Sequence, residues 1–182
     1  MNPMKRLFAA FLLVAISSVI QFTVVHGTVV DSPIRADAAK YVSYAYNLKN
    51  SGTFSHLPTW HPSHEGEPAV PDKLTLPGYP AVISLFLRGE PDQDFLSRVT
   101  LFQAALGVLS VLLVYAIASR LLPWGWAFTV GLVTAINPHL ATISTYILTE
   151  SLFTTLLLAS VLATLLAVQN NRIRLYIIAG FL

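Results

Sequence analysis

Long apolar runs alternate with shorter polar stretches along most of the chain. A helix rises about 1.5 Å per residue and the hydrocarbon core of a bilayer is about 30 Å thick, so a membrane span needs roughly 20 largely apolar residues. Runs of about this length predict four spans, near residues 7–25, 99–119, 121–136 and 151–168. A long polar loop, residues 26–98, separates the first two. The pattern predicts an all-α polytopic membrane protein.

The two ends of the pattern need separate interpretation. A last apolar run covers residues 175–182, and we interpret it as the start of a fifth span, so that residues 1–182 form the N-terminal part of a longer transmembrane domain. For the first run, a cleavable signal peptide is the alternative, with Lys5 and Arg6 before it and VVHG as its cleavage site. The run exceeds a usual signal-peptide core and three more spans follow, which favours a membrane span.

The third predicted span is the least regular of the four. Asn137 and Pro138 follow it directly, and a proline lacks the N–H that would continue a helix. We therefore expect this helix to end near Ile136. The sequence HLATISTYILT would then form a short connecting or re-entrant segment before the fourth span.

Basic residues beside the short loops predict the orientation of the chain. They are Lys5, Arg6, Arg120, Arg172 and Arg174. With four spans all five fall on one side, which is cytoplasmic by the positive-inside rule. The N-terminus is then cytoplasmic, and the loop 26–98 faces away from the cytoplasm.

The start of this extracytoplasmic loop predicts a helix. Ser32 followed by Pro33 is a typical helix start, and Asp31 beside it is expected to cap the helix or to complement its dipole. The sequence NSG at residues 50–52 is a typical helix end. We expect an amphipathic helix that lies along the outer membrane surface.

Two acidic residues remain open between a structural and a functional role. Asp37, Tyr41, Tyr44 and Leu48 recur every three or four residues, so they share one face of the predicted helix. Asp37 is either a solvated acid paired with Lys40 or a functional carboxylate at the lipid boundary. Glu150, at the start of the fourth span, either complements the helix N-terminus or faces a polar cavity.

The rest of the loop carries weaker signals. Six prolines in FSHLPTWHPSHEGEPAVPDKLTLPGYP predict an ordered or semi-ordered loop without a sheet, and LPGYPAVISLFL predicts a tight turn and a short apolar helix. His61, His64 and Glu65 are metal ligands by type, but no helix fixes their spacing. We predict no cofactor, and a divalent metal is without support.

Composition narrows the class of protein further. Hydrophobic residues make up 54% of the chain and charged residues 11%, which is typical of a membrane protein and not of a soluble domain. The formal charge of +2 is dispersed, which argues against nucleic-acid binding. The chain has no cysteine, so disulfides and thiolate chemistry are excluded.

Four motifs follow the first span in a defined order. They are RADAAKYVSYAYNLKNSGTFS, LPGYPAVISLFL, SRVTLFQAALGVLSVLLVYAIASRLL and AINPHLATISTYILTESLFTTLLLA. In this order they resemble the N-terminal part of the GT-C glycosyltransferases. More narrowly, they resemble the bacterial branch related to dolichyl-phosphate-mannose protein mannosyltransferases and lipid A aminoarabinose transferases.

The resemblance implies an enzyme of the bacterial plasma membrane that moves a sugar from a polyprenyl-phosphate donor to a lipid, glycan or protein acceptor. Transfer would take place on the extracytoplasmic side, with inversion at the anomeric carbon. The acidic motif of this branch implies that Asp37 is the general base, and it continues here with Tyr41, Ala45 and Asn47. In the eukaryotic members a second acid follows directly, where this chain has Ala38.

The same resemblance suggests further site residues. Tyr41, Glu150, Lys40 and Arg98 are candidates for the donor or acceptor site. The leaving phosphate needs a cation, and the bases that could supply it are Arg35, Lys40, Lys73, Arg88 and Arg98. We expect residues 1–182 to be inactive alone, because later helices would complete the site.

Two other functions stay open at this point. A broken helix such as the one at Asn137 and Pro138 also marks substrate sites in transporters, although the charges here lie outside the spans. A non-catalytic membrane subunit whose loop binds a partner is the second alternative.

Overall fold

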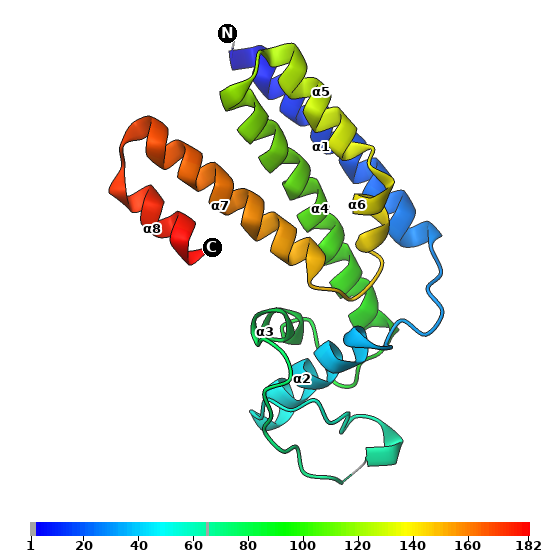
Figure 1. Cartoon of the computed structure of the whole chain (residues 1–182). Helices are drawn as coiled ribbons and strands as arrows, with labels where there is room; N and C mark the ends of the chain where they lie inside the picture. Colours follow the sequence, from blue (N-terminus) through cyan, green and yellow to red (C-terminus); the bar gives the residue numbers. More distant parts are fainter. Residues whose placement is uncertain (1–2, 65) are drawn as a thin grey trace. The chain divides into compact units, whose positions relative to one another are not determined.

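The computed structural model describes residues 3–64 and 66–182, and within them all regular structure is helical (Figure 1). The chain divides into two compact units. The span unit consists of Met1–Thr28, Gln103–Thr145 and Glu150–Leu182, and the loop unit consists of Val29–Phe102 and Tyr146–Thr149. The predicted all-α polytopic class is confirmed.

Three helices in the described residues are long and apolar enough to cross a membrane. They are α1 (Pro3–Gly27), α4 (Gln93–Leu121) and α7 (Glu150–Asn170). These helices correspond to the first, second and fourth predicted spans. The predicted start of a fifth span is also helical, as α8 (Ile173–Phe181), which packs against α7.

The third predicted span differs from the other three. It is α5 (Trp124–Ala135), which by its length rises only about 18 Å and is too short to cross a bilayer alone. The predicted break follows it and is confirmed, because Asn137 caps a second short helix, α6 (Pro138–Ile143), by accepting a hydrogen bond from the His139 N–H at 2.9 Å. The connecting segment is therefore partly helical.

Side-chain contacts show that α5 and α6 together follow the direction of α1. Near the start of α1 and at the start of α5, Phe8 and Trp124 line the same hollow. Near the end of α1, the Gln21 side chain donates to the carbonyl of Leu140 in α6 at 3.3 Å. The third passage through the described part of the span unit is thus a broken one that runs beside α1 (Figure 1).

The end of α4 lies beside the start of α1 and the end of α7. The hydroxyl of Tyr115 donates to the carbonyl of Arg6 at 3.4 Å, and the Arg120 guanidinium donates to the Gln169 side chain at 3.3 Å. The five bases that predicted the orientation consequently gather at one end of the span unit, which we call the basic end. The predicted four-span topology requires this arrangement, and both that topology and the side of the membrane that the basic end faces stay predictions.

The core of the span unit allows α5 to approach α1 closely. Leu13, Val111 and Tyr115 are buried in it, together with several alanines. Gly131 stands at the point of approach, where an added Cβ would lie 2.7 Å from Leu13 Cδ1 and 3.3 Å from Tyr115 Cβ. A larger residue has no room here.

Replacing Gly131 by Leu is therefore expected to destabilise the span unit by about 1–3 kcal/mol, because the added side chain overfills a closed core. Thermal unfolding of the detergent-solubilised protein, followed by circular dichroism, measures the change. Gly125, also on α5, has nothing within 4 Å of an added Cβ, so Gly125→Leu is the matched control. Equal stabilities of the two variants would contradict the close approach of α5 and α1.

The loop unit is built around α2 (Asp37–Ser51), with a 3₁₀ turn η1 (Pro62–His64) and the short helix α3 (Gly78–Ser84). α2 packs against α3, and the ring of Tyr41 meets that of Tyr79 edge-on with centroids 5.2 Å apart. The predicted short apolar helix is thus present as α3.

The start of α2 corrects the sequence prediction. Ser32 and Ala36 have φ angles of 49° and 51°, in the left-handed region that a right-handed helix cannot include. The helix therefore begins at Asp37 and not at Ser32, and Asp31 does not cap it. The predicted end is confirmed, because Gly52, with φ 68°, terminates the helix and donates its N–H to the carbonyl of Asn47.

Asp37, Tyr41, Tyr44 and Leu48, which the sequence spacing predicted to share a helix face, lie in α2. Tyr44 on this face is fully buried, and Tyr41 and Leu48 are half-buried. Asp37 is exposed, because it is the first residue of the helix. The helix is amphipathic as predicted, and its location at the membrane surface stays a prediction.

Candidate functional site

Asp37 lies at the edge of a hollow in the loop unit. Its walls come from the chain before α2, from the first residues of α2 and from a distant segment just before α7. The lining residues are Val30, Pro33, Arg35, Ala36, Asp37, Ala38, Tyr146, Ile147 and Leu148. Arg35 and Asp37 thus line the same hollow. The basic residue precedes the acidic one by two positions in the sequence.

The Asp37 carboxylate is held but remains accessible. Its side chain is 60% exposed, and the Lys40 Nζ lies 3.1 Å from its Oδ1, as the structural interpretation of this acid predicted. An ion pair between two exposed groups stabilises a fold by at most about 1 kcal/mol, and the N-terminus of α2 also favours a negative charge at this position. These interactions orient the carboxylate without burying it, so it can accept a further hydrogen bond from a ligand.

The remaining candidates from the loop unit make structural contacts. Arg98 donates from Nε to the carbonyl of Phe86 at 3.0 Å, and its Nη2 lies 3.9 Å from Asp92 Oδ1. These contacts fasten the chain between α3 and α4. Tyr41 packs between α2 and α3 on Tyr79. Their contacts with a donor or acceptor stay predictions.

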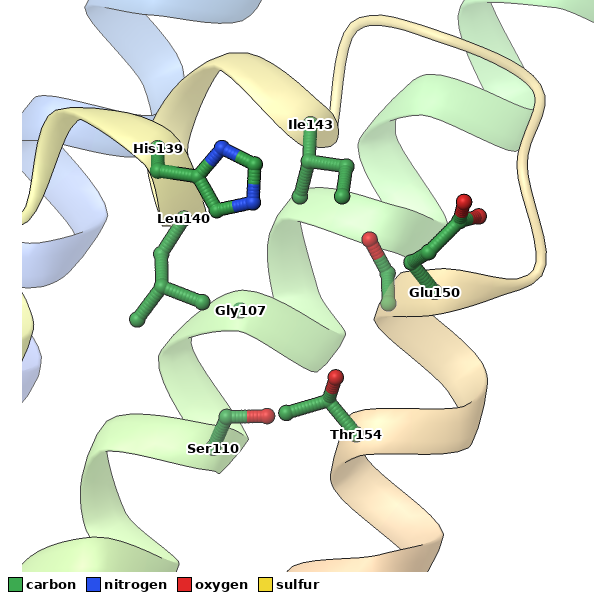
Figure 2. Close-up of a pocket in the computed structure, with 8 residues that line it drawn as sticks. Gly107, Ser110, His139, Leu140, Ile143, Glu150 and Thr154 are labelled. Carbon is green, nitrogen blue, oxygen red and sulfur yellow. The ribbon is translucent and has the colours of Figure 1, made fainter.

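Glu150 belongs to a different hollow, which lies wholly in the span unit (Figure 2). Figure 2 shows Gly107 and Ser110 on α4, His139, Leu140 and Ile143 on α6, and Glu150 and Thr154 on α7. Ser151 completes the lining. Both interpretations of Glu150 are therefore compatible with its position, because it is the first residue of α7 and also lines a partly polar hollow.

Two features of this second hollow were not expected from the sequence. His139 contributes an imidazole, and it lies there only because Asn137 starts α6 directly before it. The hydroxyl of Ser151 is buried without a hydrogen-bond partner among the described residues. A lone histidine and a serine in an apolar segment gave no periodic signal that could have singled them out.

Asp72 is the main residue of the loop unit that the sequence analysis missed. Its Oδ1 accepts hydrogen bonds from the Tyr44 hydroxyl and from the N–H of Leu74. Its Oδ2 accepts from the N–H of His56 at 2.8 Å and contacts His56 Nδ1 at 2.7 Å. One carboxylate therefore ties two separate parts of the proline-rich loop to α2.

Asn47 makes a second tie between α2 and the loop. Its side-chain amide donates to the carbonyls of Ser55 at 3.0 Å and Leu57 at 2.8 Å, and its carbonyl oxygen accepts from the Thr59 hydroxyl. Asn47 itself is buried. The loop is thus ordered, as predicted, and the motif asparagine has a structural role.

The histidines of the loop have local partners. His61 Nδ1 lies 2.7 Å from the hydroxyl of Ser63, and His64 Nδ1 lies 3.2 Å from Glu67 Oε1. Glu65, the third ligand considered, lies outside the described residues. No group of three or more His, Cys, Asp or Glu in residues 3–64 and 66–182 could hold a metal ion.

The tie between Tyr44 and Asp72 changes the ionisation of both groups. Burial raises the pKa of Tyr44 to about 12, and its hydrogen bond to Asp72 adds to the effect. Burial alone would raise the pKa of Asp72, but the hydrogen bonds from Tyr44, His56 and Leu74 outweigh it and hold that pKa well below its ordinary value. The pair is therefore a neutral phenol bound to an ionised carboxylate at neutral pH.

The high pKa of Tyr44 predicts a stability change in alkali. A raised pKa means that the folded loop unit holds the phenol proton more tightly than the unfolded chain does, so this stabilisation is complete below about pH 10 and is lost as the pH rises toward 12. The absorbance of phenolate, measured against pH in the protein and in Tyr44→Phe, should differ by one ionisation near pH 12. If the difference in phenolate absorbance between the protein and Tyr44→Phe titrates near pH 10, the buried hydrogen bond between Tyr44 and Asp72 is contradicted.

Comparison with known proteins identifies the family. No curated protein and no solved structure matches the chain. The family described as dolichyl-phosphate-mannose-protein mannosyltransferase matches residues 76–182, which are more than half of the chain and include α3 to α8 with Glu150. Asp37 and α2 precede the matched residues. The chain belongs to the dolichyl-phosphate-mannose-protein mannosyltransferase family of membrane glycosyltransferases.

Proposed function

We propose that the protein transfers a sugar from a polyprenyl-phosphate carrier to an acceptor hydroxyl on the extracytoplasmic side of the membrane, with Asp37 as general base. The observation that carries this proposal is the hollow of the loop unit, whose lining residues include both the exposed Asp37 and Arg35. The site offers a base for the acceptor and a cation for the phosphate.

Asp37 acts on the acceptor. Its carboxylate takes the hydroxyl proton while the acceptor oxygen bonds to the anomeric carbon of the sugar. The bond from that carbon to the phosphate oxygen breaks in the same step, so the configuration inverts. A positioned base of this kind contributes about 10²- to 10⁴-fold to the rate.

Arg35 stabilises the leaving group. As the carbon–oxygen bond breaks, negative charge grows on the carrier phosphate, and a guanidinium binds phosphate oxygens with two parallel hydrogen bonds. Arg35 lines the hollow of Asp37, whereas Arg98 is already bound to Phe86 and Asp92. We therefore assign the phosphate to Arg35, with Lys40 as a second positive charge beside the base.

Glu150 has a separate part in this proposal. It lines a hollow with the Ser110 and His139 side chains, which offers hydrogen-bond partners to sugar hydroxyls. We assign this hollow to the binding of the lipid-linked sugar donor or of the acceptor.

Orientation completes the proposal. The basic end of the span unit faces the cytoplasm by the positive-inside rule, in the plasma membrane of a bacterium. The N-terminus is then cytoplasmic, and the proposed reaction takes place on the opposite side.

A donor comparison tests the proposed function. The full-length protein in liposomes is given the same sugar either on a polyprenyl phosphate or on a soluble nucleotide, with a short glycan or peptide acceptor mixture. Transfer is expected from the lipid-linked donor alone, with an inverted anomeric configuration in the NMR spectrum of the product. Equal transfer from the nucleotide sugar, or a retained configuration, would contradict it.

A further inference from the structure

A third hollow, distinct from those of Asp37 and Glu150, lies at the basic end of the span unit, between the first turns of α1 and α5. Its volume is about 570 Å³, and its lining residues are Met4, Lys5, Phe8, Ala9, Leu12, Trp124 and Phe128. All of them except Lys5 are apolar. The ring of Trp124 stacks on that of Phe128 with centroids 6.2 Å apart, and Phe8 opposite them is 67% exposed. The hollow is an open apolar groove with one cation in its wall.

The charges around this groove favour an anionic occupant. Lys5 lines it directly, and Arg6 is the next residue of α1. Arg120 lies at the same end of the unit, where its guanidinium contacts Gln169. Basic residues between helices at the membrane boundary attract anionic lipid headgroups, and the body of the groove matches a hydrocarbon chain.

We propose that this groove binds an anionic glycerophospholipid of the bilayer. One acyl chain lies between Phe8 and the stacked rings of Trp124 and Phe128, and the headgroup phosphate meets the Lys5 ammonium. A second copy of the chain fits less well, because a two-fold contact at this groove would bring Lys5 and Arg6 of both copies together. This lipid site is separate from the hollows of Asp37 and Glu150, and it does not depend on the proposed reaction.

Tryptophan quenching tests the proposal directly, because Trp124 is part of the groove. The double variant Trp60→Phe/Trp126→Phe leaves Trp124 as the sole tryptophan of residues 1–182, and any tryptophan after Leu182 in the full-length protein is replaced by phenylalanine as well. The full-length variant is placed in phosphatidylcholine vesicles that contain increasing fractions of brominated phosphatidylglycerol or brominated phosphatidylcholine. Half-maximal quenching is expected at a several-fold lower fraction of the anionic lipid.

Lys5→Gln in the same background should remove roughly a five-fold preference for the anionic lipid, and Lys5→Arg should keep it. Lys49→Gln is the matched control, since Lys49 is an exposed lysine on α2 in the loop unit and should leave the preference unchanged. Circular dichroism of each variant establishes that its helices are intact.

Three results would overturn the proposal. Equal quenching by the two brominated lipids would mean that the groove holds bulk lipid without selection. Weak quenching by both, rising as the protein is diluted in lipid, would mean that a second copy covers Trp124. Recovery of fluorescence by unlabelled polyprenyl phosphate at a lower fraction than by phosphatidylglycerol would make the sugar carrier the occupant.

Discussion

Asp37→Asn is expected to reduce sugar transfer by at least about 10²-fold while expression and membrane insertion stay normal. The amide keeps the size of the carboxylate but cannot take the acceptor proton. Because the side chain is 60% exposed and its ion pair with Lys40 is weak, the substitution should change the stability of the loop unit little. Initial rates with the lipid-linked donor, at equal amounts of reconstituted protein, measure the loss.

Asp31→Asn is the matched control for this experiment. Asp31 is also an exposed aspartate, six positions earlier in the same segment, and it is outside the lining of the hollow. Its substitution should leave the rate within about two-fold of the unmodified protein. Near-normal turnover of Asp37→Asn, or an equal loss in both variants, would rule out Asp37 as the general base.

Asp72→Ala is expected to cost the loop unit about 2–4 kcal/mol. The substitution removes the acceptor of the buried Tyr44 hydroxyl and of the His56 N–H, and one of the two acceptors of the Leu74 N–H, which keeps its hydrogen bond to the Tyr44 hydroxyl oxygen. A buried donor that loses its acceptor costs more than a lost hydrogen bond alone. Hydrogen exchange of the amides of His56 and Leu74 should become much faster. Their protection in the unmodified protein gives the reference.

Two further variants distinguish the loss of the Asp72 hydrogen bonds from the mere removal of a negative charge from the loop. Glu67→Ala removes an exposed acid from the same loop, where its contact with His64 lies at the surface, and should change stability by less than about 0.5 kcal/mol. Asp72→Asn keeps one acceptor oxygen and should be intermediate. If Asp72→Ala exchanges as slowly as Glu67→Ala, Asp72 does not hold the loop.

The parts of the fold that could be predicted depend on interactions close in sequence. The long apolar runs predicted α1, α4 and α7, because a helix in a membrane satisfies its own backbone and needs only sufficient length. Pro138 and Gly52 predicted a break and a helix end through local backbone geometry. These features require no knowledge of tertiary contacts.

The parts that could not be predicted depend on distant contacts or on unusual backbone angles. Nothing in the types of Ser32 and Ala36 signals a positive φ, so the sequence predicts a helix start at Ser32, five residues before the observed start at Asp37. Asp72 and Tyr44 meet across 28 positions of an aperiodic loop. The hollow of Asp37 also takes a wall from Ile147, which is more distant still in sequence. The choice of Asp37 over Asp31 rested on the family motif.

The break at Asn137 has a mechanical consequence for the span unit. α5 is fixed where Gly131 meets Leu13, whereas α6 carries His139 and Ile143 in the wall of the hollow around Glu150. A continuous helix would couple these two segments through backbone hydrogen bonds, but Pro138 lacks the N–H for one of them. The position of α6 beside that hollow is therefore set by side-chain contacts, such as that of Gln21 with the Leu140 carbonyl, and not by a continuous backbone from α5.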